Sequence, residues 1–310
     1  MRHTRSPLAA IGLTALVGMM VSPLTAAPPA GWQMVFSDEF DAAQLDETKW
    51  STTMAFVGIH GPRYHNEYYS SYTLDEDVLL GDGLLRLRTD RRDVKGDNPA
   101  GDFAYSQGLV STHDKFTFTY GYVEIRAKYP GGKGLWPCFW LMPQDQTQWP
   151  PEFDIAEYYG GQRKMHHGLA HGTMHETLWD STGDSETDFV SDWHTYALEW
   201  TKGRAVWFVD GVVRKTIAAE YVPNCDMYVL LSNSISSRRG PSGEPDEHTV
   251  FPNFFAIDYI RVWQPPAPVV AKVVPEPAAA AVVAKLEPAD VPAIAEPEPE
   301  EELQPESLRP

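Results

Sequence analysis

The sequence is poor in cysteine and has no long apolar segment. Only Cys138 and Cys225 occur in 310 residues, which excludes a disulfide-dense scaffold, and no zinc-ligand spacing is present. Whether these two cysteines pair stays open, because export would permit a disulfide and a small buried thiol is an equal alternative. No segment shows a sustained 3.6-residue apolar repeat, which argues against a helical bundle. No apolar run matches the roughly 20 residues of a membrane-spanning helix.

Basic residues are also scarce relative to acidic ones. The chain has 25 Lys and Arg against 43 Asp and Glu, giving a net charge of −18. This balance argues against nucleic acid and anionic membranes as partners. It also disfavours a heavily sulfated polysaccharide, unless basic residues such as Arg63, Arg163 and Lys164 line the site. The simpler interpretation of the acidity is solubility.

The C-terminal segment 265–310 lacks glycine and aromatic residues and holds 11 of the 26 prolines. Such a composition buries too little apolar surface to offset the entropy of ordering. We therefore expect a disordered Pro/Ala/Glu-rich tail. A partner tether is the functional alternative, but the segment has no terminal apolar anchor.

Residues 1–27 have the pattern of a secretory signal peptide. Basic residues at the start precede an apolar stretch from Leu8 to Val21, and small residues follow it. The protein is therefore predicted to be secreted, either extracellular or periplasmic. Residues 28–264 remain as one large domain, which we expect to be monomeric.

Short runs of β-forming residues fill this domain and alternate with turn residues. Asp210-Gly211 stands between two such runs and indicates a hairpin. Regular short strands with turn signals predict an all-β sandwich. The clearest runs are 84–88, 121–128, 195–200, 205–209 and 228–232.

Three carboxylates lie within six residues, at Glu152, Asp154 and Glu157. Strand alternation places Glu152 and Asp154 on one face, and a β-bulge near Ile155-Ala156 would bring Glu157 to the same face. An ordinary half-exposed strand is the plainer interpretation. Like charges on one face repel, however, so clustering them is costly unless they have a function. Paired carboxylates are what glycoside hydrolysis needs.

The Glu-x-Asp-x-x-Glu motif, preceded by Trp-Pro-x-x-Trp at 136–140, resembles glycoside hydrolase family 16. Further segments resemble this family and follow its order between about residues 32 and 264. The resemblance implies a jelly-roll sandwich of two antiparallel sheets with a substrate cleft on the concave sheet. These further segments are 35–41, 66–69, 118–128, 193–200, 209–211 and 257–263.

The resemblance also implies roles for the carboxylates. Glu152 would be the nucleophile and Glu157 the general acid/base, with Asp154 hydrogen-bonded between them. In a retaining enzyme the two catalytic carboxyls are roughly 5–5.5 Å apart. Glu157 would need a raised pKa, from burial or from the charge of Glu152. No cofactor is required for this chemistry.

Other residues are candidates for binding the sugar. Trp136 and Trp140 are predicted stacking platforms, with core packing as the alternative, and Trp149 is a further cleft candidate. Asn66 and Glu67 match the segment that hydrogen-bonds sugar hydroxyls in the family.

His175 matches a histidine of the family's cleft. It belongs to a group of four histidines. The four-residue spacing of His171 and His175 suggests a metal site as an alternative. We favour it less, because a strand would hold the two side chains too far apart to bind one ion. The group consists of His166, His167, His171 and His175.

Many family relatives carry a structural calcium ion away from the cleft. The matching positions here are Glu39 and Asp258, with backbone carbonyls supplying further oxygen ligands. The alternative is that Asp258 pairs with Arg261 or caps a turn.

We expect a secreted, retaining endo-β-glycanase that degrades β-1,3- or mixed β-1,3/1,4-glucan. The alternatives are a hydrolase of galactan (agar or carrageenan) or exopolysaccharide, a transglycosylase, and a non-catalytic glucan-binding protein. Such binding relatives typically lose the carboxylates, and this chain retains them. Pro151 and Cys138 replace the Gly and Ala common in laminarinases, which leaves the substrate open.

Overall fold

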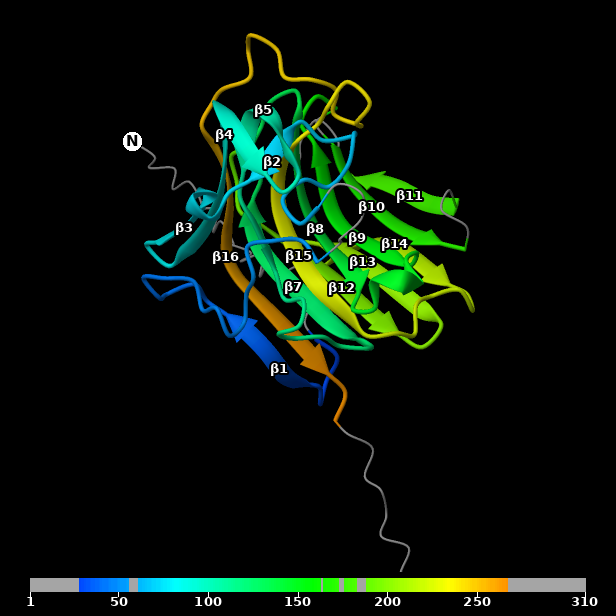
Figure 1. The fold of residues 1–310 in the computed structure, drawn as a ribbon. Coiled ribbons are helices and arrows are strands. Elements are labelled where there is room, and N and C mark those ends of the chain that lie inside the picture. The colour runs from blue at the N-terminus through cyan, green and yellow to red at the C-terminus, as the bar shows by residue number, and fades with distance from the viewer. Residues whose placement is uncertain (1–27, 56–60, 163, 173–175, 183–187, 267–310) are drawn as a thin grey trace, which may run out of the picture. The chain divides into compact units, whose positions relative to one another are not determined.

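The computed structural model describes residues 28–55, 61–162, 164–172, 176–182 and 188–266, and for 176–182 the backbone alone. All of these residues lie in the first of two units, Met1–Ala267, and none lies in the second, Pro268–Pro310. The described secondary structure is almost entirely β (Figure 1). Two short 3-10 helices accompany the strands, η1 (Asp75–Asp77) and η2 (Gln146–Gln148).

The larger sheet has ten strands, and its central path follows the order β14-β13-β12-β7-β16-β4-β5-β2. β1 (Gln33–Asp38) pairs with the last strand, β16 (Asn253–Gln264), and the two lie side by side in Figure 1. β3 (Val78–Gly81) pairs with β4. The other strands of this sheet are β2 (Ser71–Thr73), β4 (Leu84–Asp97), β5 (Ala100–Gln107), β7 (Gly121–Lys128), β12 (His194–Thr201), β13 (Arg204–Val209) and β14 (Val212–Ala218).

The second sheet has six strands in the order β11-β10-β9-β8-β15-β6. β9 (Glu152–Tyr159) carries the carboxylate motif and lies between β8 and β10. The other strands of this sheet are β6 (Leu109–Ser111), β8 (Leu135–Pro143), β10 (Lys164–His171), β11 (Glu176–Thr182) and β15 (Met227–Ile235).

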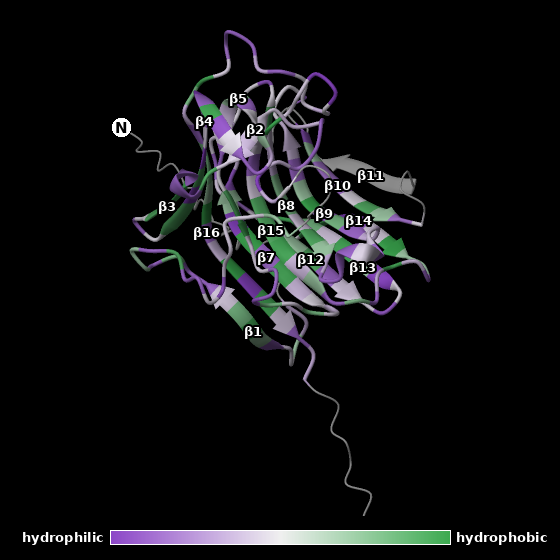
Figure 2. Cartoon of the chain, viewed as in Figure 1, coloured by the Kyte–Doolittle hydropathy of each residue, from purple (hydrophilic) through white to green (hydrophobic). Residues whose placement is uncertain are grey.

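The apolar core lies between the two sheets. Strand alternation explains it: Val123, Ile125 and Ala127 of β7 are fully buried in one cluster with Phe139 and Phe153 of the opposite sheet. Figure 2 shows apolar stretches along the central strands, while many of the connecting loops are polar. The predicted jelly-roll β-sandwich is confirmed, with one difference: β2 pairs with β5 in parallel.

The predicted hairpin at Asp210-Gly211 is also present. These two residues connect β13 to β14, and their φ angles are 49° and 76°. Positive φ at both central positions is the geometry of a type I′ turn, whose twist matches that of the flanking strands. The backbone preferences of Asp210 and Gly211 therefore account for the pairing of β13 with β14 next to the turn.

Cys138 and Cys225 are both free thiols in the structure. Among the described residues, no helix has the length and apolar character needed to cross a bilayer.

The last described strand ends at Gln264, whose side-chain amide donates to the main-chain carbonyls of Thr119 and Tyr120. We predict that truncating the chain after Gln264 leaves the melting temperature and the activity nearly unchanged, because the composition of 265–310 does not favour packing. Thermal unfolding of the full and truncated chains checks this. A fall of several degrees on truncation would contradict it.

Candidate active site

The carboxylate motif is centred on a β-bulge in β9. Across from β10, Glu157 pairs with His166 and Asp154 with Gly168, so β9 has one more residue than its neighbour between these pairs. The pairing with β8 shows the same extra residue. As a result, Ile155 and Ala156 both join the core between the sheets. The bulge predicted near Ile155-Ala156 is confirmed.

The bulge brings the three carboxylates to one face of β9. Phe153 and Tyr158 lie in the core between the sheets, whereas Tyr159 packs in a second cluster on the opposite side of the six-stranded sheet. We call this side, which faces away from the ten-stranded sheet, the outer face. Alternation on both sides of the bulge places Glu152, Asp154 and Glu157 on the outer face.

Glu152 accepts a hydrogen bond from the indole of Trp149. The distance from Trp149 Nε1 to Glu152 Oε2 is 2.7 Å. Burial raises the pKa of Glu152, and the hydrogen bonds from Trp149 and Asp154 oppose this rise because they stabilise the ionised form. Trp149, predicted as a cleft residue, thus contacts the predicted nucleophile directly.

Glu157 is buried and accepts several hydrogen bonds. Trp136 Nε1 donates to its Oε1 at 2.8 Å, the thiol of Cys138 lies 3.5 Å from the same oxygen, and Tyr159 donates to Oε2 at 3.3 Å. Burial is the main cause that raises the pKa of Glu157 to about 7, and the charge of Glu152 adds to it. A carboxyl with this pKa can carry a proton near neutral pH.

Asp154 lies between the two glutamates and is 3% exposed. Burial, followed by the charges of Glu157 and Glu152, raises its pKa well above the usual range. It hydrogen-bonds to Glu152. This bond lowers the pKa of Glu152 and raises that of Asp154, as expected when Asp154 donates the hydrogen and Glu152 accepts it. The three carboxyls therefore titrate as a coupled group.

Aromatic rings form a continuous row beside the carboxyls. Tyr69 stacks on Trp136, with ring centroids 4.4 Å apart, and His65 stacks on Tyr69 at 4.8 Å. Trp136 in turn meets the edge of Tyr159 at 6.1 Å, and His65 lies 5.8 Å from Trp140. The segment that precedes β2 thus packs over the outer face.

Trp136 and Trp140 have different surroundings. In the structure Trp136 lies between Tyr69 and Tyr159 and positions Glu157, so its predicted use as a sugar platform would require Tyr69 to move. Trp140 is 4% exposed, and its Nε1 has no hydrogen-bond partner within the described part of the chain. A buried indole N–H of this kind suits a polar ligand.

Asn66 and Glu67 lie in the loop that carries Tyr69. Asn66 Oδ1 accepts from the main-chain N–H of Tyr68 at 2.9 Å, which holds a turn. Glu67 is half exposed and pairs with Arg239 at 3.7 Å. Their predicted contacts with sugar hydroxyls stay a prediction.

The three described histidines of this group, His166, His167 and His171, have separate surroundings. His166 stacks on Tyr159 at 4.0 Å, and burial lowers its pKa to about 4, so its ring is neutral. His167 is fully buried, and His171 stacks on Tyr221. His175 lies outside the described residues, so its predicted contact stays a prediction.

The two predicted calcium ligands do not fit a calcium site as they are arranged. Glu39 forms a two-pronged ion pair with Arg261 at 2.9 and 2.7 Å, and Asp258 pairs with Arg126 at 2.6 Å. The arginine charges would repel a cation at both positions. No group of three or more His, Cys, Asp or Glu in the described ranges could hold a metal ion. The alternative pairing of Asp258 with Arg261 is not present either, because Arg261 pairs with Glu39.

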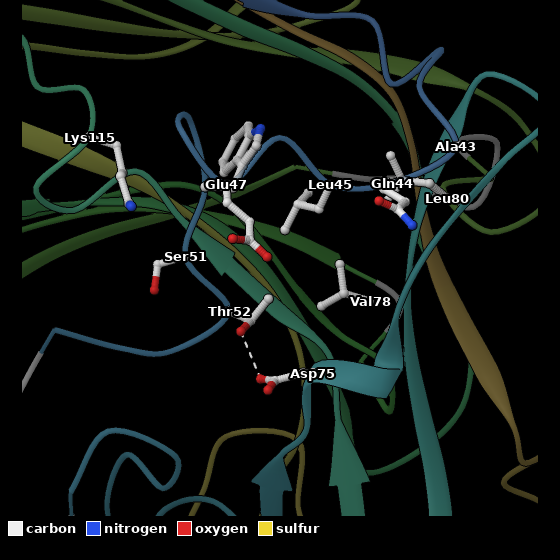
Figure 3. Close-up of a pocket in the computed structure, with 11 residues that line it drawn as sticks. Ala43, Gln44, Leu45, Glu47, Ser51, Thr52, Asp75, Val78, Leu80 and Lys115 are labelled. Atoms are coloured by element: carbon white, nitrogen blue, oxygen red, sulfur yellow. Dashed lines mark hydrogen bonds between the residues drawn. The ribbon is translucent and has the colours of Figure 1, made fainter.

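A pocket of about 510 Å³ lies between residues 43–52 and the η1–β3 segment (Figure 3). Leu45, Val78 and Leu80 line it together with the hydrogen-bonded pair of Thr52 and Asp75. No described residue among the predicted site residues lines it, so it is separate from the carboxylate motif. A smaller pocket of about 310 Å³ includes Pro151, the residue before Glu152, and the His171–Tyr221 stack.

Sequence reasoning missed several residues that contact the carboxyls. Tyr159 and Cys138 had a usable signal, since each lies two positions along its strand from a predicted site residue and so shares its face. Tyr69, which stacks on Trp136, lies in the family-like segment 66–69, but only the path of its loop places its ring over Trp136.

The family model for glycosyl hydrolases family 16 matches residues 65–236, more than half of the chain, and this range contains the whole carboxylate motif. The chain belongs to the glycosyl hydrolases of family 16. The predicted enzyme class, an endo-acting glycoside hydrolase, is thereby confirmed.

Several relatives are 25–29% identical to this family 16 hydrolase over the aligned residues. A beta-glucanase of Rhodothermus marinus is 29% identical over 254 residues, which cover 75% of this chain and 85% of the relative. Glucan endo-1,3-beta-glucosidase A1 of Niallia circulans is 28% identical, and the match covers 76% of this chain but only 38% of that longer protein.

Solved structures agree with the fold. The catalytic domain of an endo-1,3-beta-glucanase (laminarinase) from Thermotoga petrophila RKU-1 superposes with a TM-score of 0.68 at 28% identity. The match covers 76% of this chain and 98% of that domain.

Proposed function

We propose that this family 16 hydrolase is an endo-β-glucanase that cleaves β-1,3- or mixed β-1,3/1,4-glucan with retention of configuration. The observation that carries the proposal is the cluster of three carboxyls on one strand face, of which Asp154 and Glu157 are buried and Glu152 is partly exposed. Burial raises the pKa of both glutamates, hydrogen bonds oppose the rise in each, and the charge of Glu152 adds to the rise of Glu157 to about 7. A nucleophile and an acid on one face are the requirements of double displacement.

In the first step, the Glu152 carboxylate attacks the anomeric carbon. The bond from this carbon to the glycosidic oxygen breaks, and Glu157 gives its proton to the leaving oxygen. Asp154 keeps its proton and donates a hydrogen bond to Glu152. The product is a glycosyl ester on Glu152 and a free sugar hydroxyl.

In the second step, Glu157, now ionised, takes a proton from water. The water oxygen attacks the anomeric carbon and releases Glu152 as a carboxylate. A sugar hydroxyl in place of water would give transfer instead, so transglycosylation uses the same residues. The two inversions together retain the configuration at the anomeric carbon.

The surroundings of the site favour an uncharged glucan. Aromatic faces and the indole N–H of Trp140 suit neutral sugar rings and hydroxyls. Of the basic candidates for a sulfated substrate, Arg63 already pairs with Asp75 at 2.9 Å. Lys164 is exposed at the start of β10, and Arg163 lies outside the described residues. A sulfated galactan therefore has less support.

A second candidate is glucan binding without catalysis. One relative, 27% identical to this chain, is a beta-1,3-glucan-binding protein of Penaeus monodon. The presence of all three carboxyls with their hydrogen-bond donors favours hydrolysis here. We also propose that the protein is exported, because residues 1–27 have the composition of a signal peptide.

A product assay on a polysaccharide panel tests this function. Purified protein would be incubated with laminarin, lichenan, agarose, κ-carrageenan and a succinoglycan-type exopolymer. We expect oligosaccharides of several lengths from laminarin, lichenan or both, as an endo-acting enzyme produces. Products from agarose or carrageenan alone would overturn the glucan assignment, and binding without products would support the second candidate.

We predict a bell-shaped pH profile for kcat/KM. Glu157 supplies a proton only below its pKa, so the rate should fall as the pH rises through about 7. Glu152 attacks only when ionised, so the rate should also fall as the pH drops through its pKa, which burial raises above the usual range of glutamate. The initial rate on the cleaved polymer, measured across pH 4 to 9, checks both limbs.

The variant Cys138→Ala tests whether Glu157 controls the alkaline limb of this pH profile. The Cys138 thiol donates to Glu157 and thereby lowers its pKa, so removing the thiol should move this limb to higher pH. An unchanged limb in this variant would argue that another group controls it.

A further inference from the structure

The main chain at the bulge in β9 is formed by buried residues. Asp154, Ile155 and Ala156 are only 3%, 1% and 0% exposed. A bulge interrupts the regular ladder, and a buried carbonyl without a donor is costly. Donors from outside the strand ladder can therefore stabilise the main chain of these three residues.

Three buried side chains donate hydrogen bonds here, one to each carbonyl. Trp207 Nε1 donates to the carbonyl of Asp154 at 3.0 Å. His167 Nδ1 lies 2.7 Å from the carbonyl of Ile155 and must carry the hydrogen, because a carbonyl only accepts. The third bond, 3.1 Å long, runs from the hydroxyl of Tyr129 to the carbonyl of Ala156.

The donors come from both layers of the sandwich. His167 belongs to β10, beside the catalytic strand, whereas Trp207 belongs to β13 of the ten-stranded sheet. Tyr129 follows β7 of that same sheet. All three are at most 1% exposed, and Tyr129 and Trp207 reach across the core to the catalytic strand.

We propose that Tyr129, His167 and Trp207 are positioning residues for catalysis. They form a bulge clamp, a set of donors that holds the main chain of Asp154–Ala156 so that Glu157 stays in register with Glu152. This inference rests on the proposed function, in which these two carboxyls act together. None of the three donors needs to touch the sugar.

The clamp matters because the separation of the carboxyls decides the reaction. A retaining pair must be roughly 5–5.5 Å apart, and removing the bulge would turn Glu157 to the other face. A displacement of 1 Å can lower a rate by about 100-fold. Burial raises the pKa of the Tyr129 hydroxyl well above its usual value, so this donor keeps its proton across the working pH range.

The hydroxyl of Tyr129 is tested by Tyr129→Phe. We expect kcat to fall by roughly 10- to 100-fold while KM changes by less than about threefold, because the main chain of the bulge moves and the sugar contacts do not. The matched control is Tyr196→Phe. Its ring centroid is 5.0 Å from that of Tyr129, and its buried hydroxyl has no hydrogen-bond partner among the described residues. This control should retain the kinetics of the parent enzyme.

His167 gives a second, independent test. The side-chain amide of His167→Asn can still donate to the carbonyl of Ile155, whereas His167→Leu cannot. We expect Asn to preserve most of kcat and Leu to lower it about as much as Tyr129→Phe does. Thermal unfolding of each variant shows which proteins are folded. If Tyr129→Phe does not fold, the His167 pair decides the question.

A measurement without substrate separates this inference from the proposed function. The side-chain carboxyls of ¹³C-labelled glutamate would be titrated by NMR, with Glu152→Gln and Glu157→Gln assigning the signals. We expect Tyr129→Phe to shift the titration of Glu157 and Tyr196→Phe to leave it unchanged. If the parent protein cleaves no glucan but the titration shifts, the proposed function fails and the clamp stands.

The opposite results would overturn the clamp. A folded Tyr129→Phe protein with unchanged kcat and unchanged carboxyl titration would show that the hydrogen bond is merely structural. An equal loss in Tyr196→Phe would show that any buried hydroxyl in this core has the same effect. An inactive His167→Asn with an active His167→Leu would also contradict a donor role.

Discussion

Replacing Glu152 by glutamine is expected to lower kcat by at least about 10³-fold, because an amide cannot form the covalent glycosyl intermediate. Glutamine has the same shape, and its carbonyl oxygen can still accept the hydrogen bond that Trp149 Nε1 now gives at 2.7 Å. The variant also removes one of three clustered carboxyls, so its melting temperature should equal or exceed that of the parent.

The measurement is product formation on the polymer that the parent enzyme cleaves, together with thermal unfolding. Glu124→Gln is the matched control, since Glu124 is also a buried glutamate, 8% exposed, but lies in β7 and bonds to Tyr122 and Tyr259. This control should retain full activity. Substantial turnover by Glu152→Gln, above any contamination, would show that Glu152 is not the nucleophile.

Replacing Glu157 by alanine is expected to lower kcat on the polymer by about 10²- to 10⁴-fold, because the leaving oxygen then receives no proton. An activated aryl glycoside depends less on this proton. Its second step still lacks a general base, so the intermediate should accumulate until a strong nucleophile is added. Azide should therefore restore turnover and yield a β-glycosyl azide.

Chromatography and NMR of the azide product distinguish the possible results. An α-azide would indicate direct attack rather than double displacement, and the absence of any rescue would argue against an acid/base role for Glu157. Glu152→Gln serves as the control, since azide cannot act on an intermediate that never forms. The Glu157→Ala variant should also lack the alkaline limb near pH 7 that we expect for the parent.

Much of the fold follows from local patterns in the sequence. Alternation predicted strands that the structure confirms, for example Gly121–Lys128, whose bounds agree with those of β7. Asp210-Gly211 specified a hairpin through its own backbone preferences. The bulge was predictable for a different reason: three carboxylates with this spacing share a face only if one extra residue is inserted.

Contacts between distant segments were not predictable in the same way. Glu39 and Arg261 are 222 positions apart, and nothing local indicates that they pair. The calcium site implied at Glu39 and Asp258 does not match their arrangement in the structure, since both residues are paired with arginines that come from other strands. Likewise, Trp136 was predicted to stack on sugar, but the loop that carries Tyr69 covers it.

The sequence by itself indicated several strands and the clustered carboxylates, because side-chain alternation acts over a few neighbouring positions, and its resemblance to family 16 indicated the enzyme class. Only the tertiary structure decided how the carboxyls differ in protonation. Burial is the largest cause of each raised pKa, and burial depends on what packs above and below β9. The bulge donors Tyr129 and Trp207 are likewise brought to β9 only when the two sheets pack against each other.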